Sequence, residues 1–156
     1  MISMKFEIIP LEGIRPVRLG MTRKQSRLAM NIPYDSYRKR ANSPALTDSY
    51  LNNSFQVFFD KNDCVEFIEL SRGGPFEAFY KGINVFETLA EDLVAFISND
   101  AKYDENDREL GYSYTFPSIE LSLWRDILPE DDDEEGRYFW TIGIGRKGYY
   151  SESIKQ

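Results

Sequence analysis

Residues 53–71 read NSFQVFFDKNDCVEFIELS, and this stretch decides how we expect the chain to fold. Two apolar-rich runs flank the tetrapeptide DKND at 60–63, whose residues favour turns, so the pattern predicts a β-hairpin. The second run, 64–70, carries apolar residues on both of its faces and has no clean polar face. A strand of that kind is covered on both sides, which predicts a place in the middle of a sheet. Cys64 begins this run and is expected to be a buried strand residue.

Upstream of the hairpin, local signals predict one strand and one helix. Residues 5–10 (KFEIIP) are typical of a strand, and 11–20 of a loop punctuated by glycine and proline. Thr22 is followed three residues later by Gln25, a spacing that predicts a capping box at the start of a helix over 23–30.

Downstream, apolar residues recur at helical spacing within 83–100, which predicts the main helix, with Asn84 and Glu87 as its cap. After a short strand within 71–82 and that helix come three strand-like segments, 112–117, 119–126 and 137–145. Short turns between consecutive strands favour antiparallel pairing. We therefore expect a single α+β domain over 1–156: a mainly antiparallel β-sheet of about five to six strands with two helices packed on one face. The apolar residues that define the main helix are Phe86, Leu89, Leu93, Phe96 and Ile97.

Composition places the chain among folded proteins of a reducing compartment. Of its 156 residues, 42% are apolar and 15% aromatic, which is enough to build a hydrophobic core. No apolar run approaches the roughly 20 residues of a membrane span, and the first 20 residues lack the apolar region of a signal peptide. Cys64 is the sole cysteine, so no internal disulfide can form. These features predict a cytoplasmic protein with no membrane partner.

The chain contains no histidine. This removes Ser-His-Asp and Cys-His catalysis, histidine-liganded zinc and the commonest general base. An enzyme would have to use carboxylates, Lys, Tyr or Arg. Among 26 acidic residues some pair will lie close together, so a carboxylate-based hydrolase stays open as an alternative.

Two motifs that suggest ligands do not meet the requirements of their sites. Gly143, Gly145 and Gly148 match Gly-x-Gly-x-x-Gly, but only eight residues follow, too few for the helix and second strand of a dinucleotide site. We expect these glycines to form a bulge or tight bend that ends the last strand. The segments starting at Asp60 and Asp104 lack the glycine of an EF-hand loop. No cofactor and no metal site is predicted.

Charge is unevenly distributed along the chain, whose net charge is −7. Residues 1–40 hold nine basic and three acidic side chains, a net charge of +6, and residues 41–156 carry the remaining −13. Such asymmetry bears on intramolecular pairing or on the choice of partner. An acidic main body lacks the basic face that binds phosphates, so direct nucleic-acid binding is not expected.

Two acidic clusters, Asp100–Glu109 and Glu130–Glu135, and a set of tyrosines supply the candidate partner-binding residues. A preformed negative surface steers a basic protein toward it and resembles a nucleic-acid backbone, although a merely solvated loop explains the same residues. Tyrosine near the second cluster is a favoured interface anchor, with coverage of a sheet face as the alternative. The candidates are Asp104, Glu105, Asp107, Glu130, Asp131, Asp132, Asp133, Glu134, Glu135, Tyr138, Tyr149 and Tyr150.

Residues 13–30, GIRPVRLGMTRKQSRLAM, carry a pattern of glycine, proline and Gly-Met-Thr followed by a short basic helix. This pattern resembles the opening of small bacterial immunity proteins of polymorphic-toxin systems, including contact-dependent growth inhibition. The residues that carry the likeness are Gly13, Pro16, Leu19, Gly20, Met21 and Thr22.

Three further segments, 57–70, 82–97 and 136–150, are similar to the same group. The resemblance implies a small cytoplasmic protein that inactivates a cognate toxin domain, often a nuclease, by tight stoichiometric binding, without catalysis or cofactor. It transfers no binding residue, because each such protein pairs with its own toxin. The expected partner is therefore a basic toxin domain. The alternatives are an acidic adaptor for an unrelated basic protein and the carboxylate-based hydrolase.

Overall fold

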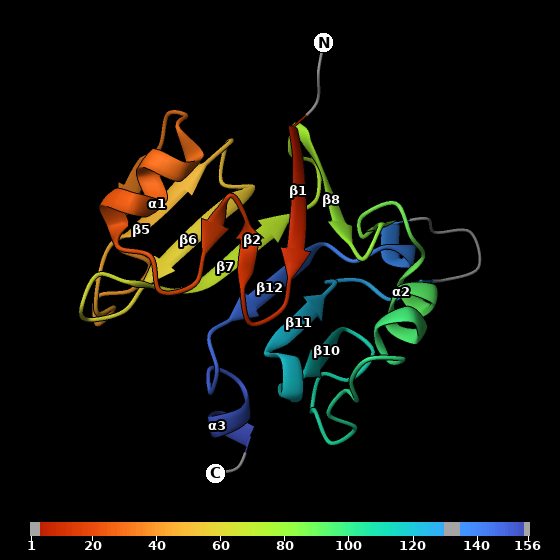
Figure 1. Cartoon of the computed structure of the whole chain (residues 1–156). Coiled ribbons are helices and arrows are strands. Elements are labelled where there is room, and N and C mark those ends of the chain that lie inside the picture. The colour runs from red at the N-terminus through yellow and green to blue at the C-terminus, as the bar shows by residue number, and fades with distance from the viewer. Residues whose placement is uncertain (1–3, 130–134, 155–156) are drawn as a thin grey trace.

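The computed structural model describes residues 4–129 and 135–154, and within them twelve strands form two sheets (Figure 1). The smaller sheet contains β1 (Met4–Ile9), β2 (Gly13–Arg15), β3 (Val17–Arg18), β8 (Phe76–Tyr80) and β9 (Ile83–Asn84), in the order β3-β2-β1-β8-β9. The larger sheet contains β4 (Asp35–Tyr37), β5 (Thr47–Tyr50), β6 (Phe55–Phe59), β7 (Val65–Ser71), β10 (Ser113–Phe116), β11 (Leu121–Trp124) and β12 (Thr141–Gly145), in the order β10-β11-β12-β7-β6-β5-β4.

The hairpin predicted from 53–71 is confirmed. Strands β6 and β7 pair antiparallel with Phe58 opposite Phe67, and a bulge follows between Phe58 and Phe59. Strand β7 lies between β12 and β6 in the middle of the larger sheet, as its apolar pattern predicts. Cys64 is free but only half-buried, so its prediction as a buried strand residue is wrong. It stands between the turn and β7, where its amide N–H donates to the Asp60 carboxylate (3.1 Å).

Helix α1 (Arg23–Met30) begins where the capping box predicts. The Thr22 side chain accepts from the Gln25 N–H and the Gln25 side chain accepts from the Thr22 N–H, so both free donors are satisfied. Asn31 ends the helix in the left-handed conformation that this residue tolerates.

Helix α2 (Ala90–Ile97) is shorter than its predicted range. It begins after Leu89, which provides no side-chain cap and is exposed, and Asn84 belongs to β9 instead of capping a helix. The carbonyl of Asn84 accepts from the Thr88 hydroxyl (2.7 Å), which holds residues 84–88 in a turn that helical periodicity alone does not reveal.

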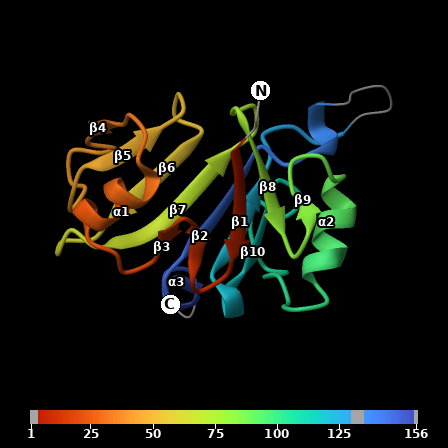
Figure 2. The ribbon, with the colours of Figure 1, turned by 45° about the horizontal axis from the view of Figure 1, so that its top comes forward.

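The α+β class and the mainly antiparallel pairing are confirmed, but the number of strands is wrong. Strands β2, β3, β4 and β5 lie in stretches without strand periodicity, and β1 pairs with β8 in parallel. The two eight-residue helices do not cover one face of one sheet: α1 lies over the larger sheet beside β5, and α2 lies at the opposite end of the molecule (Figure 2). The segment 137–145, predicted as a strand, is extended only from Thr141. Its first residue, Arg137, is the last residue of the 3-10 turn η2 (Glu135–Arg137).

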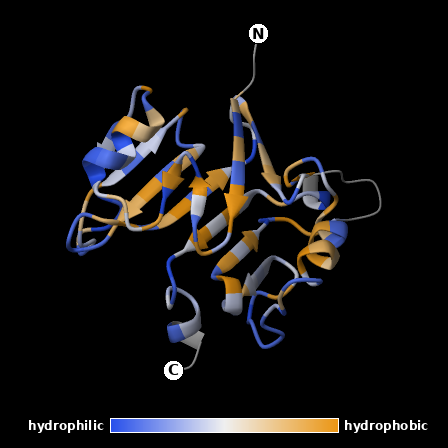
Figure 3. Cartoon of the chain, viewed as in Figure 1, coloured by the Kyte–Doolittle hydropathy of each residue, from blue (hydrophilic) through white to orange (hydrophobic). Residues whose placement is uncertain are grey.

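The two sheets share a hydrophobic core. Phe6 of β1 and Phe55 of β6 meet with ring centroids 4.8 Å apart, and Leu93 and Ile97 of α2 belong to the same buried cluster. Apolar residues concentrate on the central strands, whereas α1 is mainly hydrophilic (Figure 3). Among the described residues, no helix has the length and the apolar character required to cross a membrane.

Candidate functional site

The charge asymmetry of the sequence becomes a separation in space. Most basic residues of the first 40 lie on α1 and around β4; we name this region the basic end. Helix α2, the loop 98–112 that follows it and residues 125–129 after β11 form the acidic end, which lies on the other side of the molecule (Figure 1). The described acidic residues of the acidic end are Glu91, Asp92, Asp100, Asp104, Glu105, Asp107, Glu109 and Asp126.

Part of the basic charge is neutralised within the chain. Asp48 of β5 has no exposed side-chain surface and accepts from Arg23 (2.9 Å), from Arg27 (2.8 and 2.9 Å) and from the Ser36 hydroxyl (2.7 Å). Because a buried carboxylate needs such partners, these two arginines are structural and not a surface for anions. The hydrogen bonds and charge of Asp48 hold the pKa of Arg27 above its ordinary value.

A buried arginine organises the acidic end. The Arg125 side chain, 4% exposed, follows β11 and donates Nε to the Gly111 carbonyl (2.9 Å), Nη1 to the Gly136 carbonyl (2.8 Å) and Nη2 to Glu91 (3.1 Å). It thereby joins the end of the loop 101–111, the η2 turn and the first turn of α2. One guanidinium thus fixes the end of the first acidic loop against α2.

Several predicted acidic residues also shape their own loop. Asp104 accepts from the Asn106 N–H (3.0 Å) and Asp107 from the Glu109 N–H (2.9 Å), which are local turns of the kind that Asp favours. Glu105 is exposed between them. The predicted residues Glu130, Asp131, Asp132, Asp133 and Glu134, together with the side chain of Glu135, lie outside the described residues. No group of three or more metal-ligating side chains occurs in the described part of the chain.

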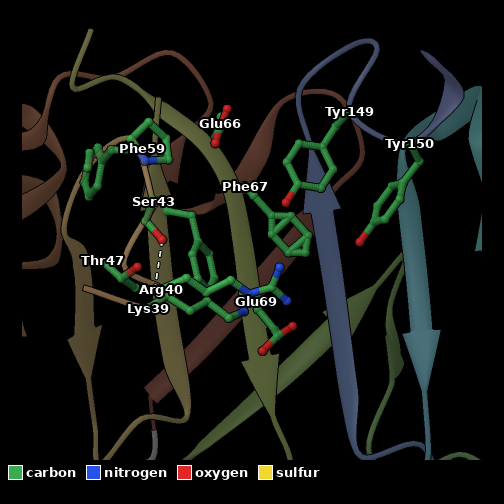
Figure 4. Close-up of a pocket in the computed structure, with 13 residues that line it drawn as sticks. Lys39, Arg40, Ser43, Thr47, Phe59, Glu66, Phe67, Glu69, Tyr149 and Tyr150 are labelled. Carbon is green, nitrogen blue, oxygen red and sulfur yellow. Dashed lines mark hydrogen bonds between the residues drawn. The ribbon is translucent and has the colours of Figure 1, made fainter. Parts of the chain in front are cut away.

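Tyr149 and Tyr150 do not join the described acidic residues of the loop 101–111. Tyr149 and Tyr150 line a pocket of about 360 Å³ on the outer face of the larger sheet, together with Phe58 and Phe67 (Figure 4). Tyr138 is half-buried elsewhere, with the Arg72 guanidinium 4.6 Å from its ring centroid. The described candidate residues therefore separate into the acidic end, the outer-face pocket and Tyr138, which packs against Arg72.

Close packing explains the glycine motif. A Cβ at Gly143 would overlap the Phe67 ring and a Cβ at Gly145 would overlap Tyr149, so both glycines let aromatic rings lie directly on β12. Gly148, with φ +93°, turns the chain after the strand, which agrees with the predicted bend. The amide N–H groups of Gly148, Tyr150 and Ser151 all donate to the buried carboxylate of Glu120.

The outer-face pocket contains charged residues that no local motif reveals. Lys39 and Arg40 enter it from the segment after β4, and Glu66 and Glu69 enter it from β7. Burial raises the pKa of both glutamates above the ordinary value, with Arg146 partly offsetting the effect at Glu66 and Lys39 at Glu69. Burial, with Glu66 and Glu69 nearby, raises the pKa of Tyr149 to about 12. A strand without a clean polar face that still contains two glutamates was the one available hint in the sequence.

Comparison with known proteins adds no relative: no protein-family model, no curated protein and no solved structure matches the chain.

Proposed function

We propose that the protein is an immunity protein that binds a cognate toxin domain, neutralises it by stoichiometric contact and performs no catalysis. The observation that carries the proposal is the acidic end, in which separate segments are held together by Arg125. A fixed cluster of carboxylates needs little rearrangement on binding, and its field accelerates encounter with a basic protein. A nuclease domain fits such a partner, because its substrate cleft must be basic to hold phosphates.

The sequence pattern at 13–30 supports the same proposal. In the structure residues 13–30 form β2, β3 and the whole of α1, and Gly20 adopts φ +89°, a conformation that favours glycine. The motif is therefore accounted for by folding, and the contact with the toxin is assigned to the acidic end. On this proposal the protein acts in the cytoplasm.

The direct test is co-expression with the C-terminal domain of the protein encoded immediately upstream. The expected result is rescue of growth and recovery of an equimolar complex. A toxic domain that kills equally in the presence of this protein contradicts the proposal. A stable complex with a basic domain that is not toxic supports the alternative of an acidic adaptor.

The role of the acidic end is tested by a change of charge alone. D104N/E105Q/D107N removes three charges, and asparagine at 104 and 107 keeps the carbonyl oxygen that accepts the local N–H bonds. The matched control E7Q/E12Q/D35N removes the same number of charges outside the acidic end. We expect the first variant to lower the association rate constant about tenfold at low salt and to flatten its salt dependence.

The association rate constant of the control variant is expected to stay within about twofold of the parent value, because charges far from the contact change this rate little. Equal effects of the two variants would show that net charge, and not this surface, governs association. Replacing residues 130–135 by Ser and Gln tests the second acidic cluster in the same assay.

The outer-face pocket favours a second candidate, a carboxylate-based hydrolase. Glu66 and Glu69 both line it, and a carboxyl with a raised pKa suits a general acid. Hydrolysis of a glycoside or ester panel that disappears in both E66Q and E69Q would establish this function in place of the first.

A further inference from the structure

The outer-face pocket lies away from the acidic end, and its lining combines aromatic rings with carboxylates. We infer that it is a binding site for a single cationic side chain, lysine or arginine, supplied by a partner protein, and that the chain's own Lys39 and Arg40 occupy it in the free protein. The inference rests on the proposed function in one respect, namely that the partner is a basic protein.

The aromatic rings supply faces that attract cations. The Lys39 ammonium lies 4.5 Å from the centroid of the Phe58 ring, within the roughly 6 Å range of a cation–π contact. Phe67 stands at the centre of the group, 5.5 Å from Phe58 and 4.7 Å from the stacked ring of Tyr149. The pocket therefore already holds one ammonium group on one of its rings.

The carboxylates favour the same sign of ligand. Glu66 contacts Arg146 (3.4 Å), whereas Glu69 forms no ion pair with any described residue. Tyr37 of β4 donates its hydroxyl to Gln56 of β6, across the intervening strand β5. Burial and the nearby charge of Glu69 raise the pKa of both Tyr37 and Tyr149. A half-buried carboxylate surrounded by rings is stabilised when a cation enters beside it.

Lys39 and Arg40 act as an internal stand-in for that cation. Both are exposed residues of the segment between β4 and β5, where Ser43 closes a turn by donating its N–H to the Arg40 carbonyl (3.0 Å). Figure 4 shows their side chains reaching from this segment over the pocket floor toward Phe67 and Glu69. An anionic ligand would pair with these two cations but would face two carboxylates and the negative faces of the rings, so the geometry favours a cation.

The inference is tested without any partner, by titrating N-acetyl-arginine amide while recording the ring resonances of Phe58, Phe67 and Tyr149. In the variant K39Q/R40Q the internal competitor is absent, so we expect the probe to bind about three- to tenfold more tightly than to the parent. Adding E69Q to that variant should weaken binding about fivefold. The control R18Q/K24Q removes two exposed basic residues outside the pocket and should change the affinity by less than about twofold.

Inorganic phosphate and a nucleoside monophosphate form the anion arm of the experiment. Binding of either to the parent that is lost in K39Q/R40Q, with no gain for arginine, overturns the inference and assigns an anion site. Absence of ring shifts with the arginine probe in every variant also overturns it. Both results leave the proposed function untouched, because co-expression rescue does not depend on this assay.

Discussion

The buried guanidinium of Arg125 provides the sharpest test of how the acidic end is held together. Replacing Arg125 by Met keeps much of the side-chain volume but removes the hydrogen bonds to the Gly111 and Gly136 carbonyls and the contact with Glu91. Hydrogen bonds from a charged donor contribute roughly 1.5–3 kcal/mol each. The Glu91 side chain is 64% exposed, so that ion pair contributes only about 0–1 kcal/mol.

The two hydrogen bonds to carbonyls together contribute about 3–6 kcal/mol. Because R125M also removes the cost of burying a charge, we expect the free energy of unfolding to fall by about 3–5 kcal/mol. For a chain of this size that corresponds to a fall in Tm of roughly 6–20 °C. R125K retains the charge but not the forked geometry, so its free energy of unfolding should lie between those of the parent and R125M. Urea denaturation with an unchanged m-value measures the loss.

The matched control is R72M. The Arg72 guanidinium lies 4.6 Å from the Tyr138 ring centroid, a contact worth about 1 kcal/mol or less. If R125M loses no more stability than R72M, the reasoning that Arg125 fastens the acidic end is refuted. Amide exchange should also accelerate at residues 110–113 in R125M while the β6–β7 hairpin keeps its protection, because Arg125 fixes only the former.

The other predictions concern the buried ion pairs of the larger sheet. Asp48→Asn keeps the shape of a fully buried side chain but removes the charge that faces Arg23 and Arg27, so we expect the free energy of unfolding to fall by about 3–5 kcal/mol. The side chain of Asp63 is 53% exposed, so Asp63→Asn should lower it by only about 1 kcal/mol or less. Urea denaturation measures both losses, and equal losses would contradict the role of burial. Burial tends to raise the pKa of Asp60, but the N–H groups of Cys64 and Asn62 and the Arg146 guanidinium outweigh it and hold the pKa below its ordinary value. A carboxyl group whose pKa is lowered by folding stabilises the fold at pH values above its unfolded pKa of about 4, and this stabilisation is lost as the pH falls. Asp60→Asn should therefore lower the free energy of unfolding at pH 7 and differ less from the parent near pH 3. A difference that does not depend on pH would show that the charge of Asp60 does not matter.

Elements defined by short-range signals were predictable. The β6–β7 hairpin depends on a turn tetrapeptide between two apolar runs, and the start of α1 depends on two side chains three residues apart. Strands β10 and β11 follow from alternation within a few residues. In each case the interactions that form the element lie inside the segment itself.

The missed strands have polar or very short sequences. In β5 every residue is buried although the segment reads TDSY, because Arg23 and Arg27 of α1 neutralise Asp48. Strand β4 is exposed throughout and is defined only by its pairing with β5. No apolar periodicity marks either strand, so pattern reasoning expected fewer strands and one sheet.

The sequence by itself determined the α+β class, the central hairpin, the capped first helix and the separation of positive from negative charge along the chain. Only the tertiary structure decided that Tyr149 and Tyr150 join Phe67 in an outer-face pocket while Arg125 joins the loop 101–111 to α2. The physical reason is distance along the chain: contacts such as that between Arg146 and Asp60 join residues 86 positions apart. Such contacts depend on which strands pair, and that pairing is set by burial of the whole core and not by any local pattern.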